Sequence, residues 1–138
     1  FPKKYQFRDK NIFLTLMLSN NQRIKKLNKQ FRNKSSATDI LSFPHQKKMK
    51  IENNLYLGDI IISYNFMDNP KHQSIYLFKR KVIKTFIHGF LHLLGFDHIK
   101  FKDYKKMVKE EKKIYQAISK KNLLILKKII LNIYFYCY

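Results

Sequence analysis

Three of the chain's five histidines fall within eleven residues, in the stretch His88-Gly-Phe-Leu-His92-Leu-Leu-Gly95-Phe-Asp97-His98. Residues four positions apart share one face of a helix, so His88 and His92 can direct both imidazoles to one point. Gly95 predicts the end of that helix, because glycine readily adopts the left-handed conformation of a C-terminal cap. The chain can then turn and return His98 as a third ligand. Three neutral imidazoles suit one zinc ion with an open fourth position, as in catalytic zinc sites, although another divalent metal is an alternative.

Two observations limit this interpretation. A lone histidine on an apolar helix is usually a core residue, and a pair at this spacing often arises by chance; three histidines with a glycine break are rarer and favour a metal site. Zinc peptidases of the His-Glu-x-x-His type carry a glutamate base directly after the first ligand. Here that position is Gly89, which argues against peptide hydrolysis by that route.

Two helices are predicted to position the histidines. The first spans about residues 73–94, after the turn signal Asp68-Asn69-Pro70, and ends in the cluster. The second spans about residues 102–121 and includes Glu111. The apolar positions that recur at helical spacing are Ile75, Phe78, Val82, Phe86 and Phe90 in the first helix, and Tyr104, Met107, Val108, Ile114 and Ile118 in the second.

The first half of the chain predicts a sheet with one helix. Residues 11–18 are apolar enough for a strand buried on both faces, residues 38–44 form a strand that Pro44 ends, and residues 55–64 form a central strand. Residues 46–54 read as an exposed, lysine-rich connection. The helix at residues 22–31, after the capping residues Ser19-Asn20-Asn21, buries Ile24, Leu27 and Phe31 and carries a basic outer face that leads into Arg32.

Composition indicates one globular domain with a polyanionic partner. The 138 residues are 45% hydrophobic and 15% aromatic, and the formal net charge is +20. Such a charge favours nucleic acid as a partner, although 25 of the 29 basic residues are lysine and an A/T-rich coding bias would also produce this composition. The single cysteine, Cys137, excludes a disulfide framework and favours a reducing, cytoplasmic location.

The two ends of the chain call for separate interpretation. The first residue is Phe1 and no initiator methionine is present, so either upstream residues are missing or the numbering starts inside the gene product. Residues 122–138 are strongly apolar, but Lys127-Lys128 interrupt them, which argues against a membrane-spanning helix. We therefore expect one domain at residues 1–121 and an apolar extension at 122–138, either packed on the domain, lying at an interface, or an unselected tail.

Four ordered motifs resemble the YbeY-type bacterial endoribonucleases over about residues 14–118. The histidine stretch is similar to the metal signature of that family, with Phe96 where tyrosine is usual. The other motifs are Leu27-Asn28-x-x-Phe31-Arg32 followed by Thr38-Asp39-Ile40-Leu41-Ser42-Phe43-Pro44, then Leu57-Gly58-Asp59-Ile60, and Met107-x-x-x-Glu111. The family normally has a strand and helix before Leu14, which would be missing here, and the tail after Lys121 is not part of its pattern.

The resemblance implies an α+β fold, in which helices pack on a small mixed sheet and the metal cleft lies at one side. It implies a hydrolase with metal-dependent endonuclease activity on single-stranded RNA, acting in rRNA maturation and ribosome quality control. The expected partners are rRNA and the ribosome or its small subunit, with no membrane and no DNA.

The chemistry of RNA cleavage assigns candidate roles to individual residues. A zinc ion on His88, His92 and His98 could activate water or polarise the phosphate while the ribose 2′-OH attacks. Arg32, which looks like the arginine that the family keeps before its Thr-Asp strand, is the candidate for stabilising transition-state charge. Asp97 either accepts an N–H from a ligand imidazole or caps the loop. Asp59 and Glu111 are further candidates for supporting the ligands, although a structural role is favoured for both.

Two other functions remain open. One is a zinc-stabilised RNA-binding or ribosome assembly factor that cuts nothing, against which the open coordination position argues. The other is a zincin-like metallohydrolase acting on peptides or small esters, for which Gly89 is the unfavourable feature.

Overall fold

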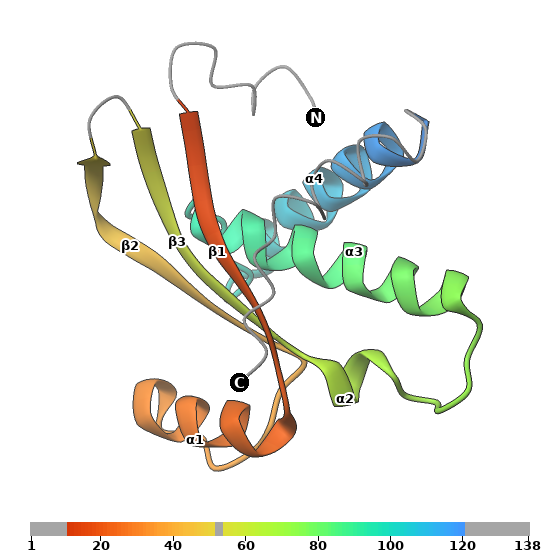
Figure 1. Cartoon of the computed structure of the whole chain (residues 1–138). Helices are drawn as coiled ribbons and strands as arrows, with labels where there is room; N and C mark the ends of the chain where they lie inside the picture. Colours follow the sequence, from red (N-terminus) through yellow and green to blue (C-terminus); the bar gives the residue numbers. More distant parts are fainter. Residues whose placement is uncertain (1–10, 52–53, 121–138) are drawn as a thin grey trace.

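The computed structural model describes residues 11–51 and 54–120 and shows an α+β fold, as predicted. A three-stranded mixed sheet carries four helices (Figure 1). The strands are β1 (Asn11–Ser19), β2 (Ile40–Ile51) and β3 (Asn54–Ser63), and the helices are α1 (Asn21–Arg32), α2 (Tyr64–Met67), α3 (Ile75–Leu93) and α4 (Phe101–Lys120). The predicted extension at 122–138 lies outside the described residues. Among the described residues, no helix is long and apolar enough to cross a membrane.

The sheet has the order β1-β3-β2, with β1 parallel and β2 antiparallel to the central strand. Because β3 is central, its Ile60 and Ile62 are fully buried. The prediction that β1 would be buried on both faces is wrong, since β1 is an edge strand and none of residues 12–19 is buried.

Strand β2 does not end at Pro44 but continues to Ile51, so the connection predicted for residues 46–54 is wrong for residues 46–51. Pro44 is tolerated because β2 is an edge strand and its register against β3 shifts between Pro44 and Met49. At an edge or a bulge the missing N–H of proline removes no ladder hydrogen bond that the sheet needs.

The two faces of the sheet bind different helices. Ile60 and Ile62 pack with Phe90 and Leu93 of α3, whereas the intervening Ile61 packs with Ile24 of α1 and with Leu41. This alternation follows from the two-residue period of a strand. Helix α4 lies against α3, where the fully buried Leu91 contacts Met107 and Ile114 (Figure 1).

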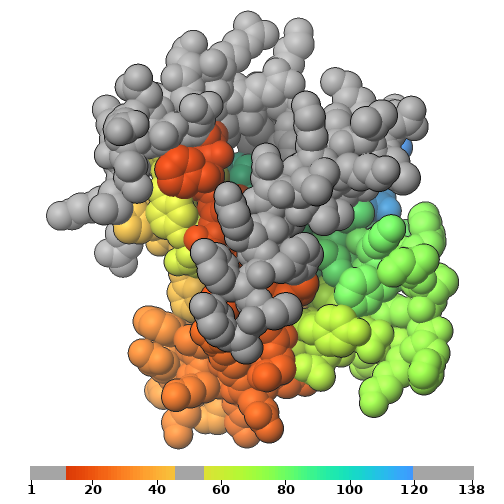
Figure 2. All heavy atoms as spheres, in the orientation of Figure 1, coloured from red at the N-terminus to blue at the C-terminus, as the bar shows by residue number. Residues whose placement is uncertain are grey.

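Three positions predicted to be apolar core are exposed, namely Phe31 (58%), Ile75 (67%) and Tyr104 (51%). Each lies at or near the end of its helix, where the spacing of apolar residues continues but none of the described helices and strands covers them. Figure 2 shows α1 and its side chains forming one end of the visible face of the molecule.

Candidate metal centre

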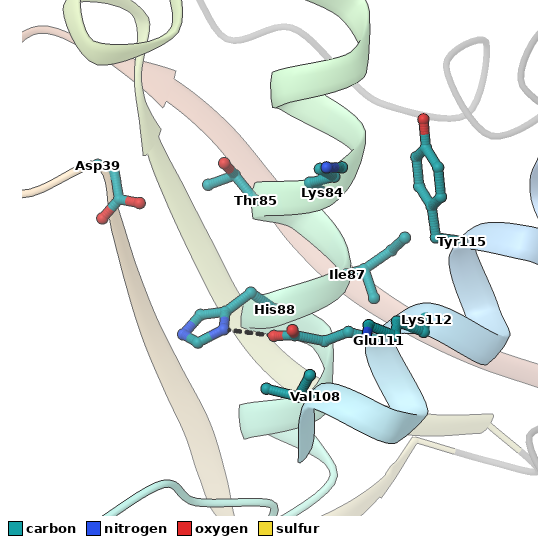
Figure 3. Close-up of a pocket in the computed structure, with 9 residues that line it drawn as sticks. All are labelled: Asp39, Lys84, Thr85, Ile87, His88, Val108, Glu111, Lys112 and Tyr115. Carbon is teal, nitrogen blue, oxygen red and sulfur yellow. Dashed lines mark hydrogen bonds and ion pairs between the residues drawn. The ribbon is translucent and has the colours of Figure 1, made fainter. Parts of the chain in front are cut away.

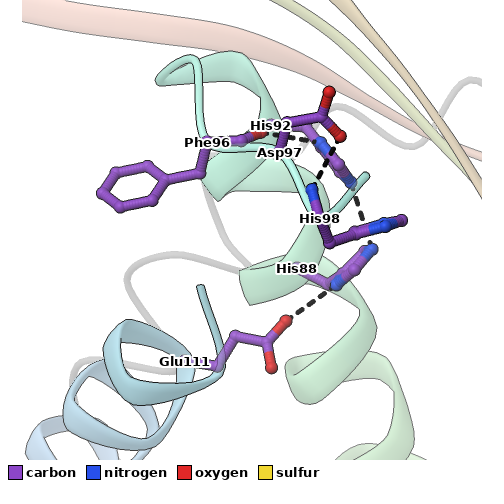
Figure 4. Close-up of polar contacts among 6 residues, drawn as sticks. All are labelled: His88, His92, Phe96, Asp97, His98 and Glu111. Carbon is purple, nitrogen blue, oxygen red and sulfur yellow. Dashed lines mark hydrogen bonds and ion pairs between the residues drawn. The ribbon is translucent and has the colours of Figure 1, made fainter. Parts of the chain in front are cut away.

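Helix α3 ends where the sequence predicted, and the end has a defined cap. Gly95 has φ +86, and its N–H donates to the carbonyl of His92 (2.9 Å), while the N–H of Phe96 donates to the carbonyl of Leu91 (3.0 Å). These two bonds form a Schellman motif, which needs a residue with positive φ at this position. The cap reverses the chain over the last turn and returns residues 97 and 98 toward the histidines of α3 (Figure 4).

The three histidines converge. One ring nitrogen from each of His88, His92 and His98 lies within 4.8 Å of the others, and the ring centroids are 4.8 to 5.3 Å apart. His88 and His92 are half-buried and His98 is exposed. Figure 4 shows the rings meeting at one side of the end of α3.

Hydrogen bonds fix the tautomers of the two helical histidines. Nδ1 of His88 lies 2.7 Å from a carboxylate oxygen of Glu111, and Nδ1 of His92 lies 3.0 Å from the carbonyl oxygen of Phe96. Both partners are acceptors, so each Nδ1 carries the proton and each Nε2 presents a lone pair. The two Nε2 atoms lie 3.2 Å apart, so both face the same point.

This arrangement fits a bound metal ion. Two nitrogens held at ~2.0–2.1 Å from one tetrahedral zinc ion would be about 3.3–3.4 Å apart, close to the observed separation. Two imidazoles that both carry their proton on Nδ1 turn their Nε2 lone pairs toward this point, and a shared metal ion accepts both lone pairs. Burial, followed by the neighbouring His88, lowers the pKa of His92, and the ring is therefore neutral near pH 7, as a metal ligand must be.

The supporting candidates occupy three different places. Glu111, for which a structural role was favoured, bonds directly to His88. Asp97 accepts a 2.7 Å hydrogen bond from the backbone N–H of His98, which corresponds to the loop-capping alternative. Asp59 lies on the α1 face of the sheet, where the hydroxyl of Tyr56 donates to it (2.5 Å), so the structure does not bring it to the histidines.

Arg32 is the last residue of α1, and its exposed guanidinium donates from Nη2 to the carbonyl of Ser42 (3.3 Å). Asn33, with φ 55, ends the helix, and the buried Asn28 holds the following loop by donating to the carbonyl of Ser36 (2.8 Å). These contacts place Arg32 beside β2. No hydrogen bond joins it to a histidine among the described residues.

Gly89 allows α3 to approach the sheet closely. A Cβ at this position would lie 2.4 Å from Cδ1 of Ile40 and 2.8 Å from Oγ of Ser42. A glutamate directly after His88 would therefore have to enter the packed contact between helix and sheet. Ser42 links the histidines' helix to Arg32. Its side-chain oxygen lies next to Gly89, and its carbonyl accepts a hydrogen bond from Arg32.

A cleft of about 450 Å³ opens beside His88, between α3 and α4 (Figure 3). Besides His88 and Glu111, it is lined by Asp39, Lys84, Thr85, Ile87, Val108, Lys112 and Tyr115. The sequence reasoning missed most of these residues. Helical spacing was the available signal, because Val108, Lys112 and Tyr115 share one flank of α4 with Glu111.

The fold and the site together define a small α+β protein in which three histidines converge on a point that could hold a metal ion. Residues 2–119 match the family described as "Endoribonuclease YbeY". The chain is 64% identical over 121 residues to "Endoribonuclease YbeY" of Pelagibacter ubique, covering 88% of this chain and 79% of that protein. It is 34% identical over 113 residues to "Endoribonuclease YbeY" of Fusobacterium nucleatum, covering 80% and 70%. A solved structure of a Thermotoga maritima protein aligns with a TM-score of 0.40 and 24% identity, covering 81% and 76%. The chain belongs to the YbeY endoribonuclease family.

Proposed function

We propose that this protein is a zinc-dependent endoribonuclease that cleaves single-stranded RNA in rRNA maturation and ribosome quality control. The endoribonuclease role follows from membership of the family. The observation that supports metal dependence is the pair of Nε2 atoms 3.2 Å apart, each made a lone-pair donor by a hydrogen bond at its Nδ1.

His88, His92 and His98 would hold the ion, one per chain. A metal with an open position supplies Lewis-acid activation of the phosphate or of a water molecule. The carboxylate of Glu111 and the carbonyl of Phe96 keep the protons of His88 and His92 on Nδ1, so these rings stay oriented with Nε2 inward. His88 is thereby both a ligand and the ring nearest to the cleft in which substrate would lie.

Arg32 would stabilise the negative charge that develops on the phosphate. A guanidinium is permanently charged and can donate two parallel hydrogen bonds to phosphate oxygens. Its single described bond, to the carbonyl of Ser42, leaves further donors available and holds the side chain on the strand that packs against Gly89.

The net charge of +20 supports an RNA substrate, with rRNA or the small ribosomal subunit as the partner. We place the catalytic unit at residues 1–121 and the protein in the cytoplasm. Asp59 has no part in this proposal. Its carboxylate accepts a hydrogen bond from Tyr56 on the face of the sheet that packs against α1, away from the histidines.

Loss of the central ligand tests the metal site. His92→Ala should lose bound zinc, measured by metal analysis of the purified protein, and should lose cleavage of a labelled single-stranded RNA. Chelator should abolish cleavage by the wild type. Full zinc occupancy in His92→Ala would refute the three-histidine site, and chelator-sensitive RNA binding without any cleavage would point to the assembly-factor alternative.

Arg32→Ala tests the charge-stabilising role separately from metal binding. The variant should keep its zinc and lower the cleavage rate by roughly 10²–10³, the usual effect of removing one donor to a transition-state oxyanion. Arg23→Ala is the matched control, because Arg23 is an exposed arginine at the other end of α1. Equal rates for the two variants would remove Arg32 from the mechanism.

A further inference from the structure

One flank of α4 carries aromatic and cationic side chains from the metal centre outward. Phe101, Tyr104, Lys105, Lys112 and Tyr115 fall within an arc of about 100° at 100° per residue, over a length of about 21 Å. The buried stripe of α4, formed by Met107, Ile114 and Ile118, lies on another side of the helix. We call the five residues of this flank, together with Lys84 of α3, the α4 track.

The two ends of the track repeat the same pairing. Nζ of Lys105 lies 4.5 Å from the ring centroid of Phe101, and Nζ of Lys84 lies 5.5 Å from that of Tyr115. Each pair places the ammonium group of a flexible lysine over an aromatic ring. That combination suits one nucleotide, whose base stacks on the ring while its phosphate meets the ammonium group.

The track passes the metal centre. Glu111, the hydrogen-bond partner of His88, lies on the same flank between Lys105 and Tyr115, and Lys84 is one turn before His88 on α3. The cleft of about 450 Å³ beside His88 includes Lys84, Lys112 and Tyr115 (Figure 3). This volume is within the usual range of ~300–1,000 Å³ for small-ligand sites.

Exposure also indicates a binding role. Phe101 is 70% exposed and follows His98 by three residues, with Ile99 between them 85% exposed. Neighbouring large apolar side chains in water are a common mark of a binding surface. Because lysines alternate with these rings, the chemistry matches single-stranded nucleic acid better than an apolar protein surface.

We infer that the α4 track binds single-stranded RNA on both sides of the phosphate presented to the metal centre, with Phe101 and Tyr115 as stacking platforms and Lys84, Lys105 and Lys112 as phosphate contacts. This inference rests on the proposed endoribonuclease function for the reaction. It adds which residues position the strand and along which helix the strand runs.

The test is the affinity of the full chain for a fluorescent single-stranded RNA, measured by anisotropy over a range of salt concentrations in chelator, so that binding is observed without metal-dependent cleavage. Phe101→Leu and Tyr115→Leu keep an apolar contact and remove the π face. Each should raise Kd about tenfold. The triple variant Lys84→Ala, Lys105→Ala, Lys112→Ala should reduce the slope of log K against log salt by about 2, at ~0.7 per phosphate contact.

Tyr76→Leu and Lys79→Ala are the matched controls, since both residues are exposed on the first turns of α3, away from the histidines. The controls should bind like the wild type, and thermal melts confirm folding of every variant. Track variants that match their controls in Kd and in salt slope would overturn the inference, even if the wild type cleaves RNA with zinc. Track-dependent binding by a protein that never cleaves would support the track and refute the proposed function instead.

Discussion

The hydrogen bond between Glu111 and His88 gives the sharpest prediction about the metal centre. Glu111→Gln keeps the size of the side chain and an acceptor oxygen but removes the negative charge 2.7 Å from Nδ1. The carboxylate strengthens the donor power of Nε2 and holds the ring in place, and the amide does so less well. Loss of such a partner usually lowers metal affinity ~10–100-fold, which corresponds to about 1.4–2.7 kcal/mol.

The effect on folding should be much smaller than the effect on metal affinity. The side chains of His88 and Glu111 are 33% and 29% exposed, so solvent screens their interaction in the metal-free protein. We therefore expect a change below about 1 kcal/mol in the free energy of unfolding in chelator. The measurement is zinc competition against a chromophoric chelator at constant pH, paired with urea unfolding of the metal-free protein.

Asp103→Asn provides the control for charge. Asp103 is another carboxylate on α4, and it pairs with Lys106 (3.3 Å) instead of a histidine. Removing it should leave zinc affinity unchanged. If Glu111→Gln and Asp103→Asn bound zinc equally well, the argument that Glu111 orients His88 would be wrong.

Two further predictions concern packing and protonation. Gly89→Ala places a methyl group 2.4 Å from Ile40 and should destabilise the fold by ~1–3 kcal/mol in urea unfolding, and an unchanged midpoint would show that α3 does not pack as described. The pKa of His92 in the folded protein is lowered below 6.5. Between that lowered pKa and about 6.5, the unfolded chain therefore binds more protons than the folded chain. The free energy of unfolding in chelator should fall as the pH drops below about 6.5. This group lowers the free energy of unfolding by at most about 1.4 kcal/mol per pH unit. His92→Gln should therefore lose less stability than the wild type between pH 7.5 and 5.5. Equal losses would show that His92 does not cause the pH dependence.

The helices and the histidine cluster were predictable because their signals are local. An i, i+4 spacing fixes a shared helix face, and glycine supplies the positive φ that the cap after Leu94 requires. Asn20 and Ser74 cap their helices, because the side-chain oxygen of each accepts a hydrogen bond from the backbone N–H three residues later. This signal also lies within a short stretch of sequence.

The errors concern features that depend on distant parts of the chain. Apolar content alone could not show that β1 lies at an edge, because strand order is set by pairing and not by composition. Pro44 indicated the end of a strand, but a shift in register at an edge accommodates it. For Asp59 a structural role was favoured over support of the ligands, and the alternation of β3 places it opposite α1, where Tyr56 donates to it.

The packing of Gly89 also explains which chemistry this site favours. A peptidase of the His-Glu-x-x-His type needs a carboxylate on the residue after the first ligand. In this fold that position contacts Ile40 and Ser42, so the space in which a glutamate side chain would start is occupied by the sheet. The carboxylate that does reach the first histidine, Glu111, lies 2.7 Å from Nδ1 of His88 and orients the ring. Strand β2, which leaves no room for a glutamate at residue 89, also holds Arg32 through the carbonyl of Ser42. The strand that excludes the peptidase base therefore carries a cation suited to a phosphate.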